Sequence, residues 1–467
     1  MQRLSRTDAG FLAAETPEWL MHVGLLMLFD AAGAKRLGPE RVRRLVTERF
    51  AHLGLFRRRV REMPGRLDRP EWRDVPELDV DAHLRSATVG APGDARALDR
   101  LVGEIFGHPL DRTRPLWELW RLEGLRDGGL ALLLKIHHAC TDGVNAAEMA
   151  LVMFDVEPDA PLERPLATGD AGEEPTTGLG RLGESAWSLA TTPLRAAHVA
   201  GDLARAAPRL GRFALSRERA AALVPFEAPA SPFNGALTSR RRFAFCSLPR
   251  ADVDAVREAA EVSLNDVVLA VCSGSLRRYL VARDAVPDKT MVAQLPMGIR
   301  RERRPVDPDA VPGNLLSAMG AALPVHLDGP ADRLRAVHAS TRAARSLHHA
   351  LGEDLLAHLV AVPPPIVLSG LVRSYQGLGL EARLPPIFNA IVSNVPGPPV
   401  PLYCGGAQLR HGYLLGPLLA GGGLNITVVS YVDSIEIGIV ACPDIVDDGW
   451  EIAEGMAPAL TDLVHAV

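Results

Sequence analysis

The stretch ALLLKIHHACTDGVNAAEMALVMFD, residues 131–155, places two adjacent histidines at the end of an almost wholly apolar run. Such a run is typical of a strand buried on both faces, and this burial requires a sheet that is covered by helices. After His138, a gap of three residues leads to Asp142 and Gly143. Apolar residues then recur at helical spacing, at Val144, Ala147, Leu151 and Phe154. The pattern therefore predicts a buried strand, a turn that carries the histidines, and a helix.

Composition limits the class of protein. The chain has 467 residues, which is enough for about two to four domains. Its hydrophobic content of 47% is ordinary for a globular protein and supplies material for large cores. The formal net charge of −5 argues against a nucleic-acid partner, because such a partner would favour a basic stripe or domain.

Cysteine usage and the uncharged segments exclude further classes. The five cysteines are scattered without a C-x-x-C pair, so we expect no disulfide framework, no metal site and a reducing compartment. Charges interrupt the first 20 residues, which therefore lack the apolar core of a signal peptide, and a cytoplasmic location is expected. The uncharged run from His411 to Val432 is long enough to span a bilayer, but Pro417 and three consecutive glycines interrupt it. We interpret Asn425–Tyr431 as a buried strand instead.

Strand-like and helical patterns alternate on both sides of a long connection. Residues 157–180 are rich in Pro, Gly, Asp and Glu, which is the composition of a linker. Residues 181–222 have a helical period, with breaks predicted at Pro193 and Pro208. Strands are predicted at His22–Asp30, Ala131–His138 and Arg241–Pro249, and helices at Arg41–His52 and Ala251–Glu261.

These patterns predict two mixed α/β halves joined by a partly helical crossover. The expected bounds are 1–160 for the N-terminal half, 161–235 for the linker and crossover, and 236–467 for the C-terminal half.

The first histidine pair is a candidate catalytic site. Neighbouring side chains on a strand point to opposite faces, so His137 and His138 are not expected to bind one metal ion together. A neutral imidazole with an ordinary pKa of ~6.5 can accept a proton at working pH, so one ring at the end of this strand can serve as a base. The alternative is that both rings are hydrogen-bonded core residues.

A second pair, His348 and His349, provides an internal comparison. No apolar strand precedes this pair, no glycine follows the nearby acid, and the surrounding residues have the pattern of one continuous helix. We therefore interpret the second pair as structural or as part of the surface.

Other chemistries have weaker support in the sequence. Cys140 lies two residues after His138 and could act as a thiol nucleophile, but no orienting Asn or Asp is identifiable. The chain has no G-x-S-x-G elbow, no Walker A motif and no G-x-G-x-x-G after a strand. These absences argue against α/β-hydrolases, phosphate-cradling loops and dinucleotide-binding domains.

The motifs together resemble a known family. HHACTDG fits the HHxxxDG motif of chloramphenicol-acetyltransferase-like, CoA-dependent acyltransferases and of condensation domains. From residue 3 to residue 465 the chain resembles the bacterial wax ester synthase/diacylglycerol acyltransferase family. The segments that carry this resemblance, in order, are RLSRTDAGFLAAETPEWLMHVG, HPLDRTRPLWELW, NDVVLA, SNVPGPPVPLY and GGGLNITVVSYVDSIEIGI.

The resemblance implies both a fold and a reaction. The fold would consist of two chloramphenicol-acetyltransferase-like halves, each a mixed sheet flanked by helices, around a substrate tunnel. A long-chain acyl group would move from acyl-CoA to the hydroxyl of diacylglycerol or of a long-chain alcohol, giving triacylglycerol or wax ester. Acyl-CoA would be a co-substrate, and no cofactor is expected. The apolar substrates imply peripheral contact with a membrane or lipid droplet, for which residues 181–222 are a candidate. The same residues could equally form a solvated clasp across the two halves.

The resemblance also implies roles for particular residues. His138 is the expected general base and His137 would orient the turn by a buried hydrogen bond. Asp142 would pair with Arg300 and join the two halves, and Gly143 permits close approach of the main chain. Candidate donors to the oxyanion are Asn265, Asn425 and Thr427.

Three of these expectations have structural alternatives. Asn265 could simply cap the helix that follows it, because asparagine is a favoured N-cap residue. The PLW segment, Pro115–Trp117, could serve core packing, because tryptophan is a strong packing residue. The apolar runs Leu355–Leu368 and Ile387–Val395 could line the acyl groove or belong to the core.

Two other functions remain open at this stage. A non-catalytic lipid-binding protein could keep the fold and lose turnover. A condensation-type acyltransferase could use carrier-bound substrates, although this chain contains no carrier domain.

Overall fold

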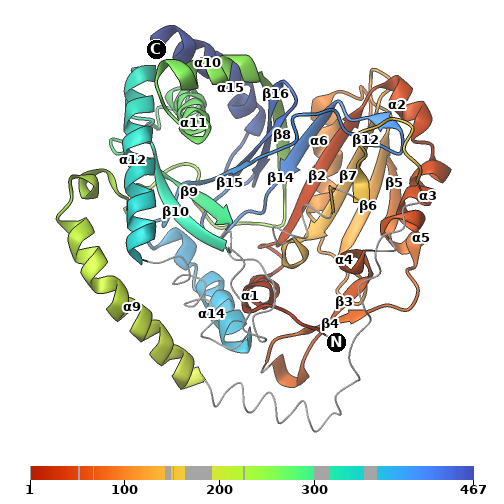
Figure 1. Ribbon diagram of the computed structural model, residues 1–467, viewed down its shortest axis with the longest axis horizontal. Coiled ribbons are helices and arrows are strands. Elements are labelled where there is room, and N and C mark those ends of the chain that lie inside the picture. Colours follow the sequence, from red (N-terminus) through yellow and green to blue (C-terminus); the bar gives the residue numbers. More distant parts are fainter. Residues whose placement is uncertain are drawn as a thin grey trace.

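The protein contains two mixed β-sheets that lie side by side, each with helices packed against it (Figure 1). The structure, a computed structural model, describes residues 2–50, 53–66, 68–141, 149–150, 152–162, 192–223, 227–298, 316–351 and 365–467. Each sheet combines parallel and antiparallel pairs. This arrangement confirms the predicted mixed α/β fold.

The N-terminal sheet has the strand order β14-β2-β7-β6-β5. Its strands are β2 (His22–Phe29), β5 (Leu84–Thr88), β6 (Trp117–Glu123), β7 (Leu130–His137) and β14 (His411–Leu415). Every residue of β7 is buried. Leu132 and Leu134 belong to one hydrophobic core and Leu133 to another, because alternate side chains face opposite sides of the sheet. Burial on both faces explains the unbroken apolar run.

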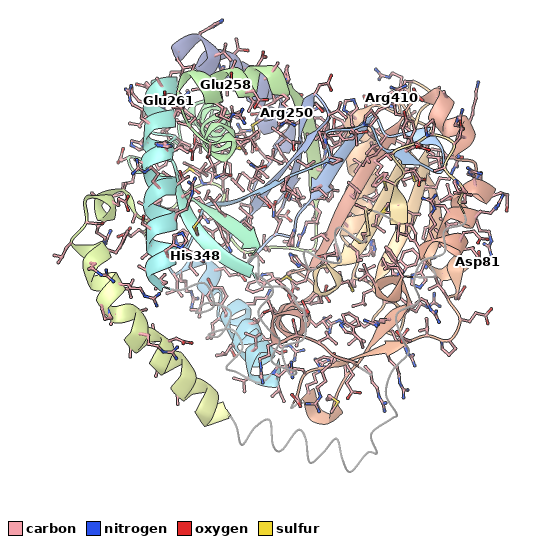
Figure 2. The ribbon with its side chains drawn as sticks, in the orientation of Figure 1. Asp81, Arg250, Glu258, Glu261, His348 and Arg410 are labelled. Carbon is pink, nitrogen blue, oxygen red and sulfur yellow. The ribbon has the colours of Figure 1, made fainter. Side chains whose placement is uncertain are left out.

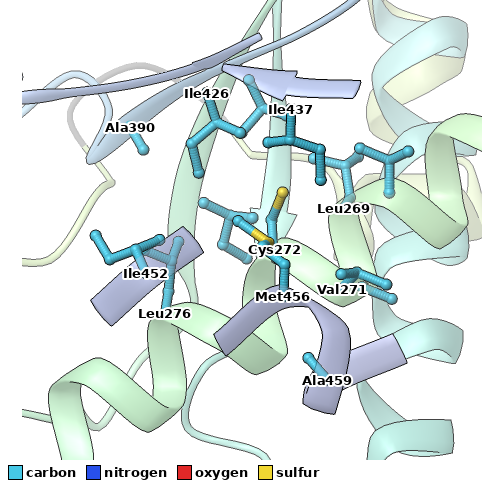
Figure 3. Close-up of a cluster of buried hydrophobic side chains, with 14 of the residues drawn as sticks. Leu269, Val271, Cys272, Leu276, Ala390, Ile426, Ile437, Ile452, Met456 and Ala459 are labelled. Carbon is cyan, nitrogen blue, oxygen red and sulfur yellow. The ribbon is translucent and has the colours of Figure 1, made fainter. Parts of the chain in front are cut away.

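The C-terminal sheet has the order β10-β9-β11-β15-β16-β8. Its strands are β8 (Arg242–Pro249), β9 (Met291–Gly298), β10 (Leu316–Leu323), β11 (Ala390–Val395), β15 (Leu424–Tyr431) and β16 (Ser434–Ala441). The helices α10 (Arg250–Ala259), α11 (Leu264–Val281), α12 (Pro330–Leu351) and α15 (Gly449–Ala466) lie with it. Figure 3 shows the core between α11, α15 and this sheet, where Cys272 and Met456 meet Ile437.

The remaining elements are short or lie at the periphery. The helices are α1 (Arg6–Ala14), α2 (Ala31–Arg36), α3 (Pro39–Glu48), α4 (Gly54–Arg57), α5 (Val80–His83), α6 (Ala95–Phe106), α9 (Thr192–Ala214) and α14 (Pro365–Gly377). The short strands are β1 (Gln2–Arg3), β3 (Arg58–Arg61), β4 (Glu71–Asp74), β12 (Tyr403–Cys404) and β13 (Ala407–Gln408). Single 3₁₀ turns are η2 (Pro64–Arg66), η3 (His138–Cys140), η4 (Arg217–Ala221) and η5 (Leu380–Ala382).

Most of the predicted elements are present, but one predicted break is wrong. The α9 helix runs from Thr192 to Ala214 and continues through Pro208, where a break was expected. A proline inside a helix removes one main-chain donor and crowds the preceding turn, yet a long helix can bend around it without ending. Pro193, by contrast, lies in the first turn, where a proline costs no internal hydrogen bond.

The uncharged run from His411 to Val432 is divided between the two sheets. Its first part forms β14, which pairs antiparallel with β2 of the N-terminal sheet. Its last part forms β15, which lies between β11 and β16 of the C-terminal sheet. This result confirms the predicted buried strand at Asn425–Tyr431. It also shows that the C-terminal half contributes a strand to the N-terminal sheet.

A buried carboxylate strengthens the junction between the halves. Asp99 of α6 is fully buried and accepts hydrogen bonds from three residues of the C-terminal half. The donors are the Arg242 guanidinium at 2.9 Å, the Phe243 main-chain N–H at 2.6 Å and the Trp450 indole N–H at 3.2 Å. Several donors are needed to offset the cost of burying a charged carboxylate.

Asp99→Ala should lower the stability of the folded protein, because it leaves these donors without their acceptor. We expect a loss of about 3 kcal/mol in the free energy of unfolding. Denaturant titration followed by tryptophan fluorescence would measure it. The control is Asp81→Ala, because Asp81 pairs with Arg43 at an exposed position and should leave the midpoint unchanged. Equal midpoints for the two variants would contradict the role assigned to Asp99.

Candidate active site

The end of β7 places His138 beside the N-terminal helix. His138 begins the η3 turn, and its main-chain N–H donates to the Met21 carbonyl at 2.7 Å. The imidazole stacks on Phe11 of α1, with 4.4 Å between ring centroids and 24° between ring planes. The strand and the helix thus hold the ring in one orientation.

The surroundings of His138 favour its neutral form. The residue keeps some exposed surface, but burial of its imidazole lowers the pKa to about 4. A hydrogen bond from the ring to its own main-chain carbonyl acts in the opposite direction and raises the pKa, whereas the nearby His137 lowers it further. Nδ1 is the ring nitrogen that can reach that carbonyl, so Nε2 points away from the main chain. A neutral imidazole held in this way is suited to accept a proton.

His137 forms the buried hydrogen bond that was expected of it. Its Nδ1 accepts from the Ala139 main-chain N–H at 3.0 Å, within the same turn as His138. This bond requires the proton of a neutral ring to lie on Nε2, which is 3.5 Å from Glu15 Oε1. His137 is therefore placed between the turn and a carboxylate.

Glu15 connects this turn to the chain that precedes β2. Its Oε2 accepts from Arg112 Nη2 at 2.7 Å, and its Oε1 accepts from the Met21 main-chain N–H at 3.2 Å. Burial raises the pKa of Glu15, but the His137 ring and the Arg112 guanidinium outweigh it and hold the pKa well below its ordinary value. Glu15 is therefore a charged, buried group directly behind the histidine turn.

Sequence analysis did not identify Phe11, Glu15 or Arg112 as part of the site. All three lie within segments that carry the family resemblance, RLSRTDAGFLAAETPEWLMHVG and HPLDRTRPLWELW. That was the available signal, but no spacing along the chain links them to residues 137 and 138. α1 packs over η3, and Arg112 comes from another part of the chain and donates to Leu12 and Glu15.

The second histidine pair lies on a helix, as predicted. His348 and His349 belong to the last turn of α12, and His348 is labelled in Figure 2. His348 is buried and His349 is exposed. The pair lacks the strand, the turn and the stacking ring that surround His138.

Cys140 is poorly suited to nucleophilic attack. The residue is buried under the histidine turn, and burial raises the pKa of its thiol. The thiolate, which is the nucleophilic form, is therefore disfavoured. The geometry favours the imidazole over the thiol as the reactive group of this turn.

The candidate oxyanion donors lie in the C-terminal half. Asn425 and Thr427 are buried on the same face of β15. Asn425 Nδ2 donates to the Pro417 carbonyl at 2.7 Å, and Thr427 Oγ1 donates to Asn425 Oδ1 at 2.9 Å. The single hydroxyl proton of Thr427 is thus used, whereas Asn425 retains a second amide proton. Their oxyanion role stays a prediction.

Asn265 does not cap the helix that follows it, so that alternative is wrong. The N-cap of α11 is Ser263, whose hydroxyl accepts from the Asp266 main-chain N–H. Asp266 is fully buried, and it also accepts from Thr341 Oγ1 at 2.6 Å and from His338 Nδ1 at 3.0 Å. This carboxylate ties α11 to α12 and leaves Asn265 in the first helical turn.

The other family segments have structural contacts. Trp117 of the PLW segment is buried, and its indole N–H donates to the Phe56 carbonyl at 3.0 Å. This position supports the core-packing interpretation. In the NVPGP segment, a Cβ atom on Gly397 would lie 1.9 Å from the Ser430 carbonyl oxygen, so only glycine fits.

Three predicted site residues lie outside the described residues. They are Asp142, Gly143 and Arg300, so the proposed ion pair between the halves is untested. Most of the apolar run Leu355–Leu368 also lies outside the described residues.

Comparison with known proteins identifies the family. Residues 4–268 match the wax ester synthase/diacylglycerol acyltransferase catalytic domain, and residues 312–464 match the C-terminal domain of the same family. A Mycobacterium tuberculosis H37Rv relative with a provisional diacylglycerol O-acyltransferase name is 37% identical over 470 residues, covering 99% of this chain and 100% of the relative. The chain belongs to this family. It is therefore an acyltransferase, as the resemblance implied.

Further relatives agree with this assignment. The probable diacylglycerol O-acyltransferase tgs2 of Mycobacterium tuberculosis H37Rv is 34% identical over 472 residues, covering 100% of both chains. The solved wax ester synthase/diacylglycerol acyltransferase of Marinobacter aquaeolei VT8 aligns with a TM-score of 0.69 and 28% identity, covering 99% of this chain and 98% of that one. A condensation domain of the calcium-dependent antibiotic synthetase shares the fold, with a TM-score of 0.53 and 17% identity, covering 99% of this chain and 95% of that one.

Glu15→Gln should impair catalysis while the fold persists. The substitution keeps the shape of the side chain but removes the charge that faces His137 and Arg112, so the histidine turn loses part of its support. Misplacement of a catalytic group by about 1 Å can cost about 100-fold in rate, and we expect kcat for acyl transfer to fall by about 10- to 100-fold with little change in KM for acyl-CoA.

The matched control is Glu18→Gln, three residues along the same segment and exposed. It should retain the wild-type kcat, and both variants should be checked for unchanged thermal midpoints. Equal kcat values for the two variants would rule out a positioning role for Glu15.

Proposed function

We propose that this protein transfers a long-chain acyl group from acyl-CoA to the hydroxyl of diacylglycerol, with long-chain alcohols as a second class of acceptor. The observation that carries the proposal is the neutral, stacked imidazole of His138 at the end of a buried strand, within an HHxxxDG motif. The diacylglycerol acyltransferase names of the relatives support the acceptor class. The product is triacylglycerol, or a wax ester when the acceptor is an alcohol.

In the proposed reaction, His138 acts as the general base. The acceptor hydroxyl is a weak nucleophile at neutral pH, and His138 Nε2 removes its proton as the oxygen attacks the thioester carbonyl. The tetrahedral intermediate then collapses, the carbon–sulfur bond breaks, and His138 returns the proton to the CoA thiolate. One ester forms, one thioester is consumed, and the imidazole ends as it began.

The developing oxyanion needs a hydrogen-bond donor in a water-poor site. Among the predicted donors, Asn425 retains an amide proton, and Asn265 is only half-buried at the start of α11. We further propose that Asp142 pairs with Arg300 instead of with His138, so that the acid fixes the loop between the halves.

His138→Ala should abolish most acceptor-dependent release of CoA from palmitoyl-CoA. Loss of a general base costs about 10²–10⁴-fold in rate, and a fall in this range is expected with diacylglycerol and with hexadecanol. His349→Ala, which removes an exposed imidazole from α12, is the control and should retain wild-type turnover. Turnover that persists in a folded His138→Ala protein would exclude His138 as the base.

The rate should also report the pKa of His138. Only the neutral ring accepts a proton, so kcat/KM should stay level as the pH falls from 7 and should decline only near pH 4, where the ring becomes protonated. Measurements with a soluble acceptor, and with circular dichroism at each pH, would separate this decline from unfolding. A decline centred near the ordinary histidine pKa of ~6.5 would contradict the proposed environment of the ring.

Two alternative functions make different predictions. A lipid-binding protein without turnover would bind acyl-CoA and release no CoA with any acceptor. A condensation-type enzyme would require a phosphopantetheinylated carrier protein and would not use acyl-CoA with a simple alcohol. The same CoA-release assay separates all three functions.

We also propose peripheral contact with a membrane or lipid droplet, because the acceptor dissolves in such phases. Among the described residues, no single helix is long and apolar enough to cross a membrane. Helices α10 and α11 reach the required length and apolar composition only together, and the pair is bent by 108°. The crossover helix α9 was the candidate contact surface from the sequence. Its arginines include Arg205, Arg209 and Arg212.

A further inference from the structure

Helix α14 presents an apolar face to solvent. On this helix Ile366, Val367 and Leu371 are 45%, 47% and 60% exposed, and Leu378, which directly follows, is 58% exposed. The opposite face, which includes Ser369 and the partly buried Val372, Tyr375 and Gln376, is turned toward the protein. A surface helix of a globular protein normally has its apolar side inward, so this helix presents unexpected apolar area to its surroundings.

Two further apolar side chains are exposed in the segment that follows the helix. Leu384 and Ile387 are 46% and 52% exposed and lie in the segment that leads to β11. We refer to Ile366, Val367, Leu371, Leu378, Leu384 and Ile387 as the α14 face. Scattered apolar residues on a surface are ordinary, but this number within 22 positions is typical of an interaction site.

The α14 face lies close to the catalytic histidine. Helix α14 packs on α1, as Figure 1 shows, and hydrogen bonds join it to α1 and to the residues that directly follow α1. Ser369 Oγ donates to the Ala13 carbonyl at 2.8 Å, and Gln376 Nε2 donates to Thr16 Oγ1 at 3.0 Å. Phe11 of α1 in turn stacks on His138. Only one helix therefore separates α14 from the imidazole.

The exposed charged residues between positions 365 and 387 are arginines. Arg373 and Arg383 are exposed. Glu381, the only acid between positions 365 and 387, is half-buried and accepts from the Leu237 main-chain N–H at 3.3 Å. An apolar face bordered by arginines is complementary to a surface of anionic lipid, with apolar chains beneath charged headgroups.

We propose that the α14 face docks on an anionic lipid surface and brings the active site to the acceptor dissolved in that surface. This inference rests on the proposed function for the identity of the acceptor. The exposed apolar side chains would insert at the boundary of the acyl chains, while Arg373 and Arg383 contact headgroups. Docking beside α1 gives the acceptor a short path to His138.

The charges argue against a second copy of this chain as the partner. A two-fold interface pairs the same patch from both subunits. Both subunits would then bring Arg373 and Arg383 into the same interface, which would concentrate positive charge there. A lipid surface provides the missing negative charge.

The test compares two double variants of the full-length protein. Leu371→Asp/Leu378→Asp places charges on the α14 face, and Leu203→Asp/Leu215→Asp does the same at exposed positions on and just after α9. Each is mixed with vesicles of phosphatidylcholine containing phosphatidylglycerol, and binding is measured by flotation. We expect at least a 10-fold loss of binding for the α14 variant and no loss for the α9 variant.

A charge variant and an activity assay make the test independent of folding defects. Arg373→Ser/Arg383→Ser should bind purely phosphatidylcholine vesicles like the wild type and lose the preference for phosphatidylglycerol. The α14 variant should keep wild-type CoA release with a short-chain, water-soluble alcohol and lose activity only toward diacylglycerol in vesicles. Activity on the soluble alcohol tests the proposed function separately from docking.

Several results would overturn the docking proposal. These are a wild type that does not bind the vesicles, equal binding by the α14 variant, and loss of binding confined to the α9 variant. A wild-type dimer that becomes monomeric in the α14 variant, with vesicle binding retained, would instead assign this face to a second copy of the chain.

Discussion

The main-chain pairing of β14 with β2 holds the active site together. β14 belongs to the C-terminal half in sequence, yet its five residues pair in register with Gly24–Leu28 of the N-terminal sheet. Only eight residues then lead to β15, so one sheet fixes the position of the other. Without β14, β2 would be an edge strand paired only with β7. The junction around Asp99 lies beside β8 and adds a second, polar connection between the halves.

Burial decides which group of the histidine turn can react. The same apolar surroundings that lower the pKa of His138 raise the pKa of the Cys140 thiol, because burial disfavours a charge on either group. Glu15 remains charged in this region because the His137 ring and the Arg112 guanidinium outweigh the effect of burial on its pKa. The turn thus combines the neutral ring of His138 with the negative charge of Glu15, which lies behind His137. This arrangement favours one tautomer of each imidazole.

Local patterns predicted much of the scaffold. The apolar run before His138 predicted β7, and the continuous helical pattern around His348 predicted α12. Two predictions about helix ends were wrong because each relied on a single residue. Pro208 was expected to end a helix that instead continues, and Asn265 was considered as a cap although Ser263 has that role. Both errors concern helix ends, where several residues compete for the same main-chain groups.

The sequence by itself determined the mixed α/β class, the position of the histidine pair at the end of a buried strand, and the family. These depend on side-chain periodicity and on contiguous motifs, which are local properties of the chain. Tertiary structure alone decided that α1 covers the histidine turn and that Glu15, more than 100 residues away, lies behind His137. It also decided that an apolar face of α14 remains outside the core. Long-range packing sets these relations, since no spacing along the chain encodes which distant segment meets which.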